Sequence, residues 1–497
     1  MELFDNLALG FSTALQFKNL FFCLVGVLIG TLIGVLPGIG PIPTIALLLP
    51  FTFGMAPATA FIMLAGIFYG AQYGGSTTAI LVNLPGETSS VVTCLDGHQM
   101  AKQGRAGPAL AIAAMSSFFA GTVATLVMAL LSVPLARLAL KFTAVEFFSL
   151  LVLGLIAAVV MAHGSVAKSL AMVLLGLLIG LVGIDVNSGA ARMTFNIPEF
   201  FDGIGFVSVA MGFFGLGEIM ANLERPQERR VMSQSLRDLM PRWADLKASF
   251  GAMLRGTALG SILGVLPGGG AALPSFAAYA LEKKLARDPS RFGQGAIEGV
   301  AAPEAANNAG AQTSFIPLLT MGIPSNALMA LMLGAMMMQG IQPGPQVLRE
   351  QPELVWGLIA SMWTGNLMLL VINLPLIGVW VSMLKVPYRL LFPAIVLFCC
   401  VGAFAINNSV VDVWVMLVCG VLGYFFIKVG VETAPLLLGM VLGPMLEENL
   451  RRAMLISGGD YSVFVTRPIS ALLLGVAVAL ILILASPAVL RMRKEGL

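Results

Sequence analysis

Runs of apolar residues, separated by short polar segments, fill most of the chain. A helix of about 20 apolar residues is long enough to cross a bilayer. The first such run covers 20–36 and the last covers about 469–490. We therefore predict an all-α polytopic membrane protein with about 10–12 transmembrane segments. The other predicted helices lie near 57–71, 109–136, 146–163, 166–184, 204–221, 326–339, 354–384, 391–406, 411–427 and 433–446.

The composition supports this class of protein. Of the 497 residues, 58% are hydrophobic and 11% are charged, whereas about 25% of the residues in a soluble domain are charged. So few charges cannot cover the surface of a soluble enzyme, and the composition also excludes a disulfide scaffold and a disordered chain. The net charge of +3 gives no indication of nucleic-acid binding.

Motifs of enzymes and metal sites are absent from the sequence. There is no nucleotide-binding P-loop and no HExxH zinc-protease motif. The five cysteines form no CxxC pair, and two histidines cannot build a multi-histidine metal site. We therefore expect no enzyme activity, no cofactor and no permanently bound metal. A transient Na⁺ remains possible, because backbone carbonyls at helix breaks suit that ion.

One segment of the first half of the chain recurs in the second half. Gly30-Thr-Leu-Ile-Gly-Val-Leu-Pro-Gly-Ile-Gly40 matches Gly260-Ser-Ile-Leu-Gly-Val-Leu-Pro-Gly-Gly-Gly270, so that Gly30 corresponds to Gly260. A looser echo follows in the same order at a slightly larger offset, and together the two indicate an internal duplication. It pairs Gly70-Ala71-Gln72 with Gly310-Ala311-Gln312, and Leu84-Pro85-Gly86 with Ile323-Pro324-Ser325.

The charge distribution indicates how these repeats are oriented. Seven basic residues lie between Arg225 and Arg255, and positively charged loops remain in the cytoplasm. The C-terminal end is also basic, whereas the N-terminal end carries Glu2 and Asp5. We expect a cytoplasmic linker and C-terminus and a periplasmic N-terminus. The two repeats then have opposite orientations, as in many secondary transporters. The alternative is a twelve-helix bundle whose duplicated halves share one orientation.

This interpretation divides the chain into four parts. Transmembrane repeat 1 covers 1–221, and the cytoplasmic linker covers 222–249. Transmembrane repeat 2 covers 250–449. A C-terminal loop and an extra transmembrane helix cover 450–497 and return the chain to the cytoplasm.

Each repeat is expected to begin with a re-entrant hairpin. Only about 31 residues lie between Phe250 and Ala280, although two full crossings need about 40. A basic cluster that begins at Lys283 follows, and a single crossing would place it outside. A hairpin that enters from the cytoplasm and breaks at 267–270 satisfies both constraints. By the repeat, 20–54 should form a matching hairpin from the other face, with its tip near Gly38–Pro41.

Four stretches combine Pro and Gly with small polar residues, and we interpret them as helix breaks around a binding site. Broken helices in a membrane occur where they line a cavity or are buried in protein. The stretches are 36–44, 72–88, 266–275 and 303–326. Gly74-Gly75 is expected to interrupt a helix, so that Ser76 and Thr77 cap the next one. Capping and helix–helix contact are the structural alternative for any one of these residues.

With few cations in the apolar regions, an anion would be bound mainly by helix N-termini and neutral donors. We place it between the two repeats, near mid-membrane. The candidate substrate-binding residues are Gly38, Gly40, Thr44, Gly75, Ser76, Thr77, Asn83, Pro85, Gly268, Gly270, Ser275, Asn307, Asn308, Thr313, Ser314, Pro324, Ser325 and Asn326. The candidates for binding the coupling ion are Gln72, Glu304 and Gln312.

At these residues the chain resembles the large membrane subunit of the tripartite tricarboxylate transporters (TctA-type). The most specific match is Glu298-Gly-Val-Ala-Ala-Pro-Glu-Ala-Ala-Asn-Asn308. One departure is Gly322-Ile-Pro-Ser-Asn326, where the family usually has Gly-Ile-Pro-Gly-Ser. The other matching segments are Gly34–Pro41, Tyr73–Glu87, Asp96-Gly97 with Met100-Ala101, Phe292–Ile297 and Pro343-Gly-Pro345.

The resemblance implies a secondary transporter that imports citrate or a related carboxylate across a bacterial inner membrane, coupled to Na⁺ or H⁺. It also implies two protein partners, a periplasmic solute-binding protein and a small membrane subunit. We expect an elevator-like movement against a scaffold of the helices at 109–136 and 354–384, with rocking as the alternative. A channel, or a carrier for another small anion without ion coupling, is the competing function, and an intramembrane enzyme is a third.

Overall fold

The computed structural model describes residues 2–36, 40–162, 165–185, 188–224, 240–266, 270–373, 375–383 and 388–485. In these ranges nearly all regular structure is helical, and the single sheet pairs two short strands, β1 (Gly183–Ile184) and β2 (Ala191–Arg192). Six of the described helices are long and apolar enough to cross a membrane, and six further apolar helices are shorter. The predicted all-α polytopic fold is confirmed.

The first half of the chain begins with α1 (Glu2–Ala14), α2 (Phe17–Val35), α3 (Pro41–Thr52) and α4 (Pro57–Val82). A 3₁₀ turn, η1 (Thr88–Ser90), leads directly into α5 (Val91–Lys102), which the long α6 (Ala106–Ala139) follows. The remaining elements are α7 (Ala144–Met161), α8 (Val166–Gly180), η2 (Pro198–Phe200), α9 (Phe206–Ala210), the π-helical η3 (Met211–Leu216) and α10 (Gly217–Leu223).

The second half repeats much of this order. It begins with α11 (Trp243–Val265), α12 (Ala272–Leu285), η5 (Pro289–Arg291), α13 (Glu298–Thr313), α14 (Phe315–Met321) and α15 (Ala327–Met338). The short α16 (Val347–Glu350) precedes α17 (Pro352–Asn373) and α18 (Ile377–Met383). The last elements are α19 (Tyr388–Asn407), α20 (Val410–Lys428), α21 (Ala434–Ile456), α22 (Val463–Thr466) and α23 (Pro468–Ala485).

Glycines hold the central helix pair of each half in close contact. A Cβ at Gly26, Gly30 or Gly34 of α2 would collide with the main chain of α4, at Met63, Ile67 and Ala71 respectively. In the second half, α11 packs on α13 in the same way. The glycines of α11 are those that the sequence repeat pairs with the glycines of α2. They are Gly256, Gly260 and Gly264, which meet Ala302, Ala306 and Gly310 of α13.

The same register continues through the break that follows each pair. α4 ends at Asn83 and α14 ends at Gly322, and both residues have a left-handed backbone with φ of 58° and 71°. The next helices are capped by Glu87 and Asn326, which occupy equivalent positions. The predicted duplication therefore has a structural counterpart. In this register, Ala71 corresponds to Gly310. The sequence match that paired Gly70 with Gly310 therefore differs from the structural register by one position.

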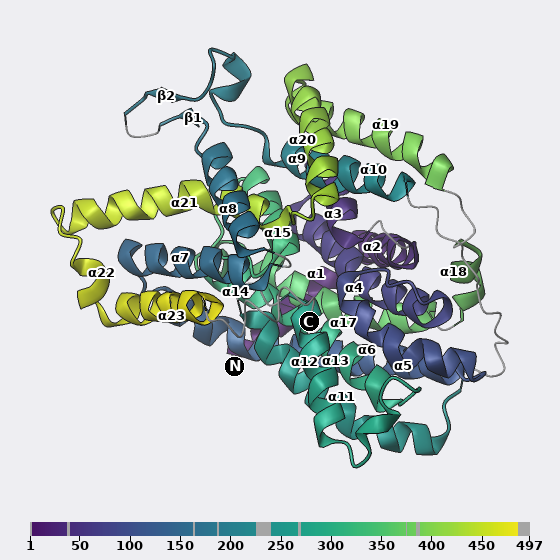
Figure 1. The fold of residues 1–497 in the computed structure, drawn as a ribbon. Coiled ribbons are helices and arrows are strands. Elements are labelled where there is room, and N and C mark those ends of the chain that lie inside the picture. The colour runs from purple at the N-terminus through teal and green to yellow at the C-terminus, as the bar shows by residue number, and fades with distance from the viewer. Residues whose placement is uncertain are drawn as a thin grey trace.

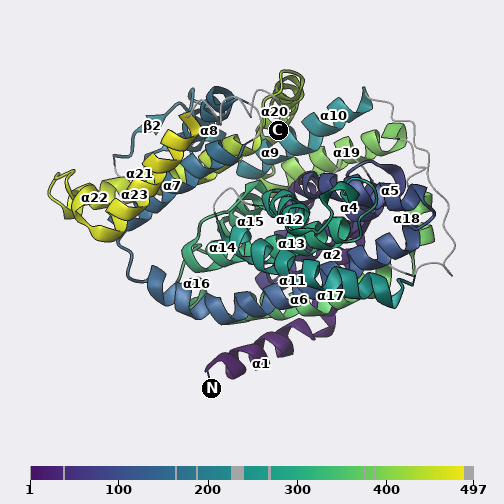
Figure 2. The ribbon, with the colours of Figure 1, turned by 60° about the horizontal axis from the view of Figure 1, so that its bottom comes forward.

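Two groups of helices, which we call the core and the arms, differ in their position (Figures 1 and 2). The core contains α2–α5 and α11–α15 at the centre, with α6 and α17 against it. The arms contain α7–α10 and α19–α21. In the arms, helices from different halves of the chain pack on each other. α8 of the first half packs on α21 of the second half, and α20 of the second half packs on η3 and α10 of the first half. Glycines again make these contacts, as Gly176 does with Leu436 and Gly212 does with Met416.

The predicted break at Gly74-Gly75 is wrong, although both predicted stretches, 72–88 and 303–326, contain a break near their ends. α4 continues without interruption through Gly74-Gly75, and α13 continues through 303–313. Gly74 instead lets α4 approach the main chain of α2 at Thr31. The hydroxyl of Thr77 donates to the carbonyl of Tyr73 one turn earlier, and the hydroxyl of Ser76 points to Glu304 on another helix, so neither caps a helix. The breaks lie later, at 83–87 and 322–326.

Other predictions can be compared directly with the helix bounds. Both predicted hairpins contain two helices, α2 with α3 and α11 with α12, although their tips at 37–39 and 267–269 lie outside the described residues. The run at 354–384 is not one helix, because α17 ends at Asn373 and α18 begins at Ile377. Most of the predicted linker, 225–239, is also outside the described residues.

Candidate functional site

A cavity of about 580 Å³ lies where the breaks of both repeats meet the arms. The core contributes the segments 40–43, 85–89, 270–273 and 326–328, together with side chains of α4 and α12. The arms contribute Ala158 and Ala162 from the α7 side, Glu218 from α10, and 432–438 at the start of α21. Most of this lining is apolar, with a few polar groups, as is usual for small-molecule sites.

Four helices begin at this cavity. Their N-cap residues all line it, and they are Gly40 for α3, Glu87 for the 3₁₀ turn η1, Ala271 for α12 and Asn326 for α15. The first N–H groups of a helix have no partner within the helix, and the helix dipole adds partial positive charge at this end. Ala272, Leu273, Ala327 and Leu328 therefore present main-chain N–H groups near the cavity, an arrangement suited to an anion.

Carboxylates also reach the cavity. Glu87, Glu218 and Glu432 line it, and its lining contains no Lys or Arg among the described residues. An ionised glutamate at this cavity would repel an anion unless a cation or a proton balances its charge. The lining thus combines groups that attract an anion with groups that require positive charge.

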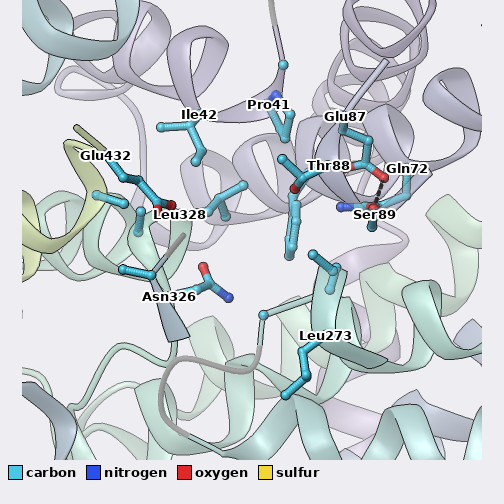
Figure 3. A pocket seen from close by; sticks show the side chains of 18 of the residues that line it. Pro41, Ile42, Gln72, Glu87, Thr88, Ser89, Leu273, Asn326, Leu328 and Glu432 are labelled. Carbon is cyan, nitrogen blue, oxygen red and sulfur yellow. Dashed lines mark hydrogen bonds between the residues drawn. The ribbon is translucent and has the colours of Figure 1, made fainter. Parts of the chain in front are cut away.

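A polar cluster forms one wall of the cavity (Figure 3). Ser89 donates to the carboxylate of Glu87 and lies 3.0 Å from Oε1 of Gln72. From behind, Nδ2 of Asn307 in α13 donates to the same Glu87 oxygen at 3.2 Å. Asn326 and Leu328 lie on the other side of the cavity from this cluster. We call Gln72, Glu87, Ser89 and Asn307 the Glu87 cluster.

A second carboxylate lies deeper in the core. Glu304 of α13 is 0% exposed and accepts hydrogen bonds from three hydroxyls, those of Ser76, Thr93 and Ser117. Asn308 donates to Ser117 at 2.7 Å. Ser76, Thr77 and Glu304 line a separate void of only about 20 Å³. This network connects α4, α5, α6 and α13 and does not face the large cavity.

The structure divides the residues proposed from the sequence into several groups. Gly40, Pro85, Gly270, Asn326 and Gln72 line the large cavity. Ser76, Thr77, Asn308 and Glu304 belong to the deeper network, and Asn307 connects to the cavity through Glu87. Gly38 and Gly268 lie outside the described residues.

The remaining candidate residues either make local contacts within the protein or lie away from the cavity. Asn83 is exposed at the end of α4, and Gly75 allows the side chain of Glu87 to approach α4. Pro324 is buried in the break, and Gln312 is 2% exposed with no hydrogen-bond partner for Oε1 among the described residues. The hydroxyls of Thr44, Ser275, Thr313, Ser314 and Ser325 donate to main-chain carbonyls.

Sequence reasoning missed three carboxylates, two hydroxyl residues and two aromatic residues of the lining, the last being Phe68 and Phe276. Glu87 follows Pro85-Gly86 directly, so its place at a helix break was visible in the sequence. Glu218 and Glu432 are isolated carboxylates next to apolar runs, a signal typical of functional positions in membrane proteins. Phe68 gives no such signal, because an aromatic residue in an apolar helix is ordinarily a packing residue.

The fold and the cavity define a polytopic α-helical membrane protein with an internal cavity at the helix breaks of its two halves. The sequence profile of the tripartite tricarboxylate transporter TctA family matches residues 20–438. The chain therefore belongs to the tripartite tricarboxylate transporter TctA family. It is a component of a transporter and a multi-pass membrane protein.

Two similar proteins come from Agrobacterium vitis. One, described as an uncharacterized 52.8 kDa protein in the TAR-I ttuC' 3' region, is 58% identical over 489 residues, 98% of this chain and 97% of that protein. The other, an uncharacterized protein in the TAR-II ttuC' 3' region, is 60% identical over 236 residues, 48% of this chain and 98% of that protein. No solved structure matches the chain.

Proposed function

We propose that this chain forms the translocation pathway of a secondary importer for a citrate-like tricarboxylate or a related carboxylate. The observation that carries the proposal is the convergence of four helix N-caps on one cavity, at Gly40, Glu87, Ala271 and Asn326. Main-chain N–H groups there give charge-assisted hydrogen bonds to a carboxylate. These bonds replace part of the hydration that the anion loses.

Cation coupling by Na⁺ or H⁺ is the second part of the proposal. Moving an anion into a cell with an inside-negative potential costs about 2.3 kcal/mol per charge for each 100 mV. A trianion therefore requires about 7 kcal/mol at 100 mV. The sequence contains no P-loop through which ATP could supply this energy. The carboxylate of Glu87, which lines the cavity beside the helix N-termini, supports coupling, because positive charge must accompany the anion.

An elevator-like movement of the core against the arms is the third part. The cavity lies at this boundary, and the contacts of α3 and α15 with the arms are apolar. Leu47 faces Gly215, and Phe206 lies over Gly334. By contrast, α6 and α17 are hydrogen-bonded to the core, since Tyr73 donates to Asn366 at 2.6 Å. We therefore place the moving boundary at the arms instead of at the helices 109–136 and 354–384.

The membership in a tripartite family supports two partners, a periplasmic solute-binding protein that delivers the anion and a small membrane subunit. We place the complex in a bacterial inner membrane. The N-terminus is then periplasmic, and the linker and the C-terminus are cytoplasmic. The two repeats have inverted orientations in this arrangement.

The experiment is uptake of radiolabelled carboxylates into proteoliposomes that contain the chain with both partners. Na⁺ and H⁺ gradients are imposed separately, and tri-, di- and monocarboxylates are compared. We expect saturable uptake of one carboxylate that stops when the coupling gradient is removed. Uptake that never saturates supports a channel, and saturable uptake that ignores both gradients supports an uncoupled carrier. Either result contradicts the proposal.

A further inference from the structure

The N-terminus of α3, in the first repeat, has few N–H groups to offer an anion. The first three residues of this helix are Pro41, Ile42 and Pro43, and proline has no main-chain N–H. Among these positions only Ile42 carries an N–H that the helix leaves without a partner. The hydroxyl of Thr44 does not replace the missing groups, because it donates to the carbonyl of Gly40. α3 therefore reaches the cavity with a single main-chain donor in its first three positions.

The polar wall of the first repeat directs its donors at a carboxyl group of its own, that of Glu87. Ser89 and Asn307 donate to this group from their side chains. The main-chain N–H of Ser90 donates to it as well, in a capping box. These donors are not free for a carboxylate that enters the cavity, and an ionised Glu87 would repel it.

The second repeat presents free donors at its helix starts. α12 begins with Ala272 and Leu273, and α15 begins with Ala327 and Leu328. The N–H groups of these four residues have no partner within their helices. Asn326 adds an amide nitrogen, since its Oδ1 already caps α15. All five residues line the cavity.

The N-termini of α12 and α15 lie close together. A Cβ at Gly270, just before the N-cap of α12, would lie 3.6 Å from Cβ and 3.7 Å from Nδ2 of Asn326. At Gly40, the counterpart of Gly270 in the first repeat, no described heavy atom lies within 4 Å of such a Cβ. Asn326 and Leu328 lie across the cavity from Glu87 (Figure 3). The free donors are thus gathered on one side of the cavity.

Two helix N-termini also determine how much negative charge the cavity favours. Each supplies the equivalent of roughly half a positive charge, and the lining contains no Lys or Arg among the described residues. Two carboxylates can each meet one N-terminus. A third would have to lie against Glu87 or against apolar side chains such as Phe68 and Phe276, where it would lose its hydration without gaining donors.

We propose that the substrate is a short dicarboxylate whose two carboxylates bind at the N-termini of α12 and α15. This inference rests on the proposed function, which covers tricarboxylates and related carboxylates, and it names the class of substrate. A monocarboxylate makes only one of the two contacts. A tricarboxylate brings a third charged group that finds no donors.

The experiment measures ligand binding to the full-length chain in detergent, by isothermal titration and by the rise in unfolding temperature. The ligands are succinate with two carboxylates, tricarballylate with three and butyrate with one, together with their hydroxylated forms malate, citrate and 3-hydroxybutyrate. Na⁺ is kept constant, and the pH is about 8, where all these acids are ionised. We expect the better dicarboxylate to bind about tenfold or more tightly than either other class, since one hydrogen-bonded carboxylate separates them.

Two variants assign the carboxylates to the two helices. Ala327→Pro removes the first N–H of α15 at a position that tolerates proline, because Asn326 before it is extended. It should weaken dicarboxylate binding about tenfold, and monocarboxylate binding less, because a single carboxylate can still use α12. Ala271→Asp places a negative charge at the N-cap of α12, where aspartate is favourable for the helix, and should weaken dicarboxylate binding to a similar degree.

Each variant has a matched control. Val410→Pro makes the same change at the first position of α20, after the extended Ser409 and away from the cavity. Ala56→Asp makes the same change at the exposed N-cap of α4. Both controls should bind the dicarboxylate as the wild type does.

Three outcomes overturn the inference: a wild type that binds none of these ligands, a tricarboxylate or monocarboxylate that binds as tightly as the better dicarboxylate, or either variant with wild-type affinity. Each variant keeps the test valid if the other does not fold. Failure of the proposed function is distinguishable. If the dicarboxylate binds as expected but proteoliposomes do not take it up, the substrate class stands and the importer does not. If an ion gradient drives uptake of a tricarboxylate instead, the importer stands and the substrate class does not.

Discussion

The hydroxyl of Ser76 in α4 donates to the carboxylate of Glu304 in α13 at 2.6 Å, although 228 residues separate them in the chain. Thr93 in α5 and Ser117 in α6 donate to the same carboxylate. Four helices from both halves of the protein are thus joined at one buried carboxyl group. The network explains why polar residues are concentrated in α4 and α13, where the sequence alone indicated a binding site.

Ser76→Ala should destabilise the protein by about 1–3 kcal/mol, because it leaves a buried oxygen of Glu304 with one hydrogen-bond donor fewer. Ser132→Ala is the matched control, since Ser132 is also fully buried but its hydroxyl donates only to the carbonyl of Met128 one turn earlier. Unfolding temperatures in detergent compare the two variants. Equal losses in both would show that the contact with Glu304 contributes nothing beyond an ordinary buried hydroxyl.

Gly34→Ala should prevent α2 from packing on α4, because the added Cβ would fall on the carbonyl of Ala71. Overpacking of this kind costs about 1–3 kcal/mol, and Gly264→Ala should behave alike in the second half. Gly475→Ala in α23 should have little effect, since no described heavy atom lies within 4 Å of its Cβ position. The yield of folded protein after membrane extraction and its unfolding temperature test this. A stable Gly34→Ala variant would mean that the helices can separate freely.

Asp96→Ala should loosen the contact between the two halves at the end of α5. Oδ1 of Asp96 accepts the N–H groups of Gly293, Gly295 and Ala296, at 2.8–2.9 Å, and Oδ2 accepts from Tyr279. The two glycines have φ of +84° and +100°, which explains why this loop needs glycine.

Each N–H left without an acceptor costs about 1–3 kcal/mol, so Asp96→Ala should unfold at a much lower temperature and be cut faster by trypsin near Arg291. Asp96→Asn keeps an acceptor oxygen and should lose far less, and Tyr279→Phe removes only one bond. If all three variants resist trypsin as the wild type does, Asp96 does not hold the loop.

Helix positions were largely predictable because burial in lipid requires long apolar runs. The run at 109–136 became α6 (Ala106–Ala139), and the run at 411–427 became α20 (Val410–Lys428). The duplication was predictable too, since the helix contacts through Gly30 and Gly260 demand glycine at fixed spacing. The helix breaks that line the cavity also followed from the sequence, because Pro85-Gly86 and Pro324 lie at polar, small-residue stretches where a helix ends.

The break at Gly74 was predicted wrongly for a physical reason. Glycine ends helices, but it also lets two helices approach, and composition does not distinguish these roles. The role of a glycine depends on the residue that packs against it. For Gly74 this residue is Thr31 of α2. In the same way, the roles of Ser76 and Asn308 depend on Glu304 and Ser117, which long stretches of sequence separate from them. No local pattern encodes such contacts.

Cysteines placed at 283 and 229 should react with a membrane-impermeant maleimide only from the cytoplasmic side. Lys283 is exposed at the end of α12, whereas Arg229 lies outside the described residues and rests on the sequence alone. Asp5→Cys is the opposite control and should react only from the periplasmic side. The five native cysteines are replaced first, and right-side-out vesicles are compared with inverted ones. Labelling of position 283 from outside would contradict the hairpin and the inverted repeats.

Asn326→Asp should weaken anion binding while the protein stays folded. Oδ1 of Asn326 caps α15 by accepting from the N–H of Met329 at 2.9 Å, so the amide nitrogen is the group left for the cavity. Aspartate keeps the cap and replaces that donor with a negative charge among the helix N-termini. Losing a hydrogen bond to a charged ligand costs about 1.5–3 kcal/mol, which raises the apparent KM for uptake about ten- to a hundredfold.

The comparison with two other substitutions separates binding from folding. Asn326→Ala should lose both the donor and the cap, and therefore also about 1 kcal/mol of stability. Asn449→Asp makes the same chemical change in α21, where the amide donates to the carbonyl of Met445 away from the cavity, and should leave KM unchanged. Uptake in proteoliposomes and unfolding temperatures are measured for all three variants. A wild-type KM for Asn326→Asp would place the anion elsewhere, because a carboxylate cannot bind unaffected beside a new negative charge.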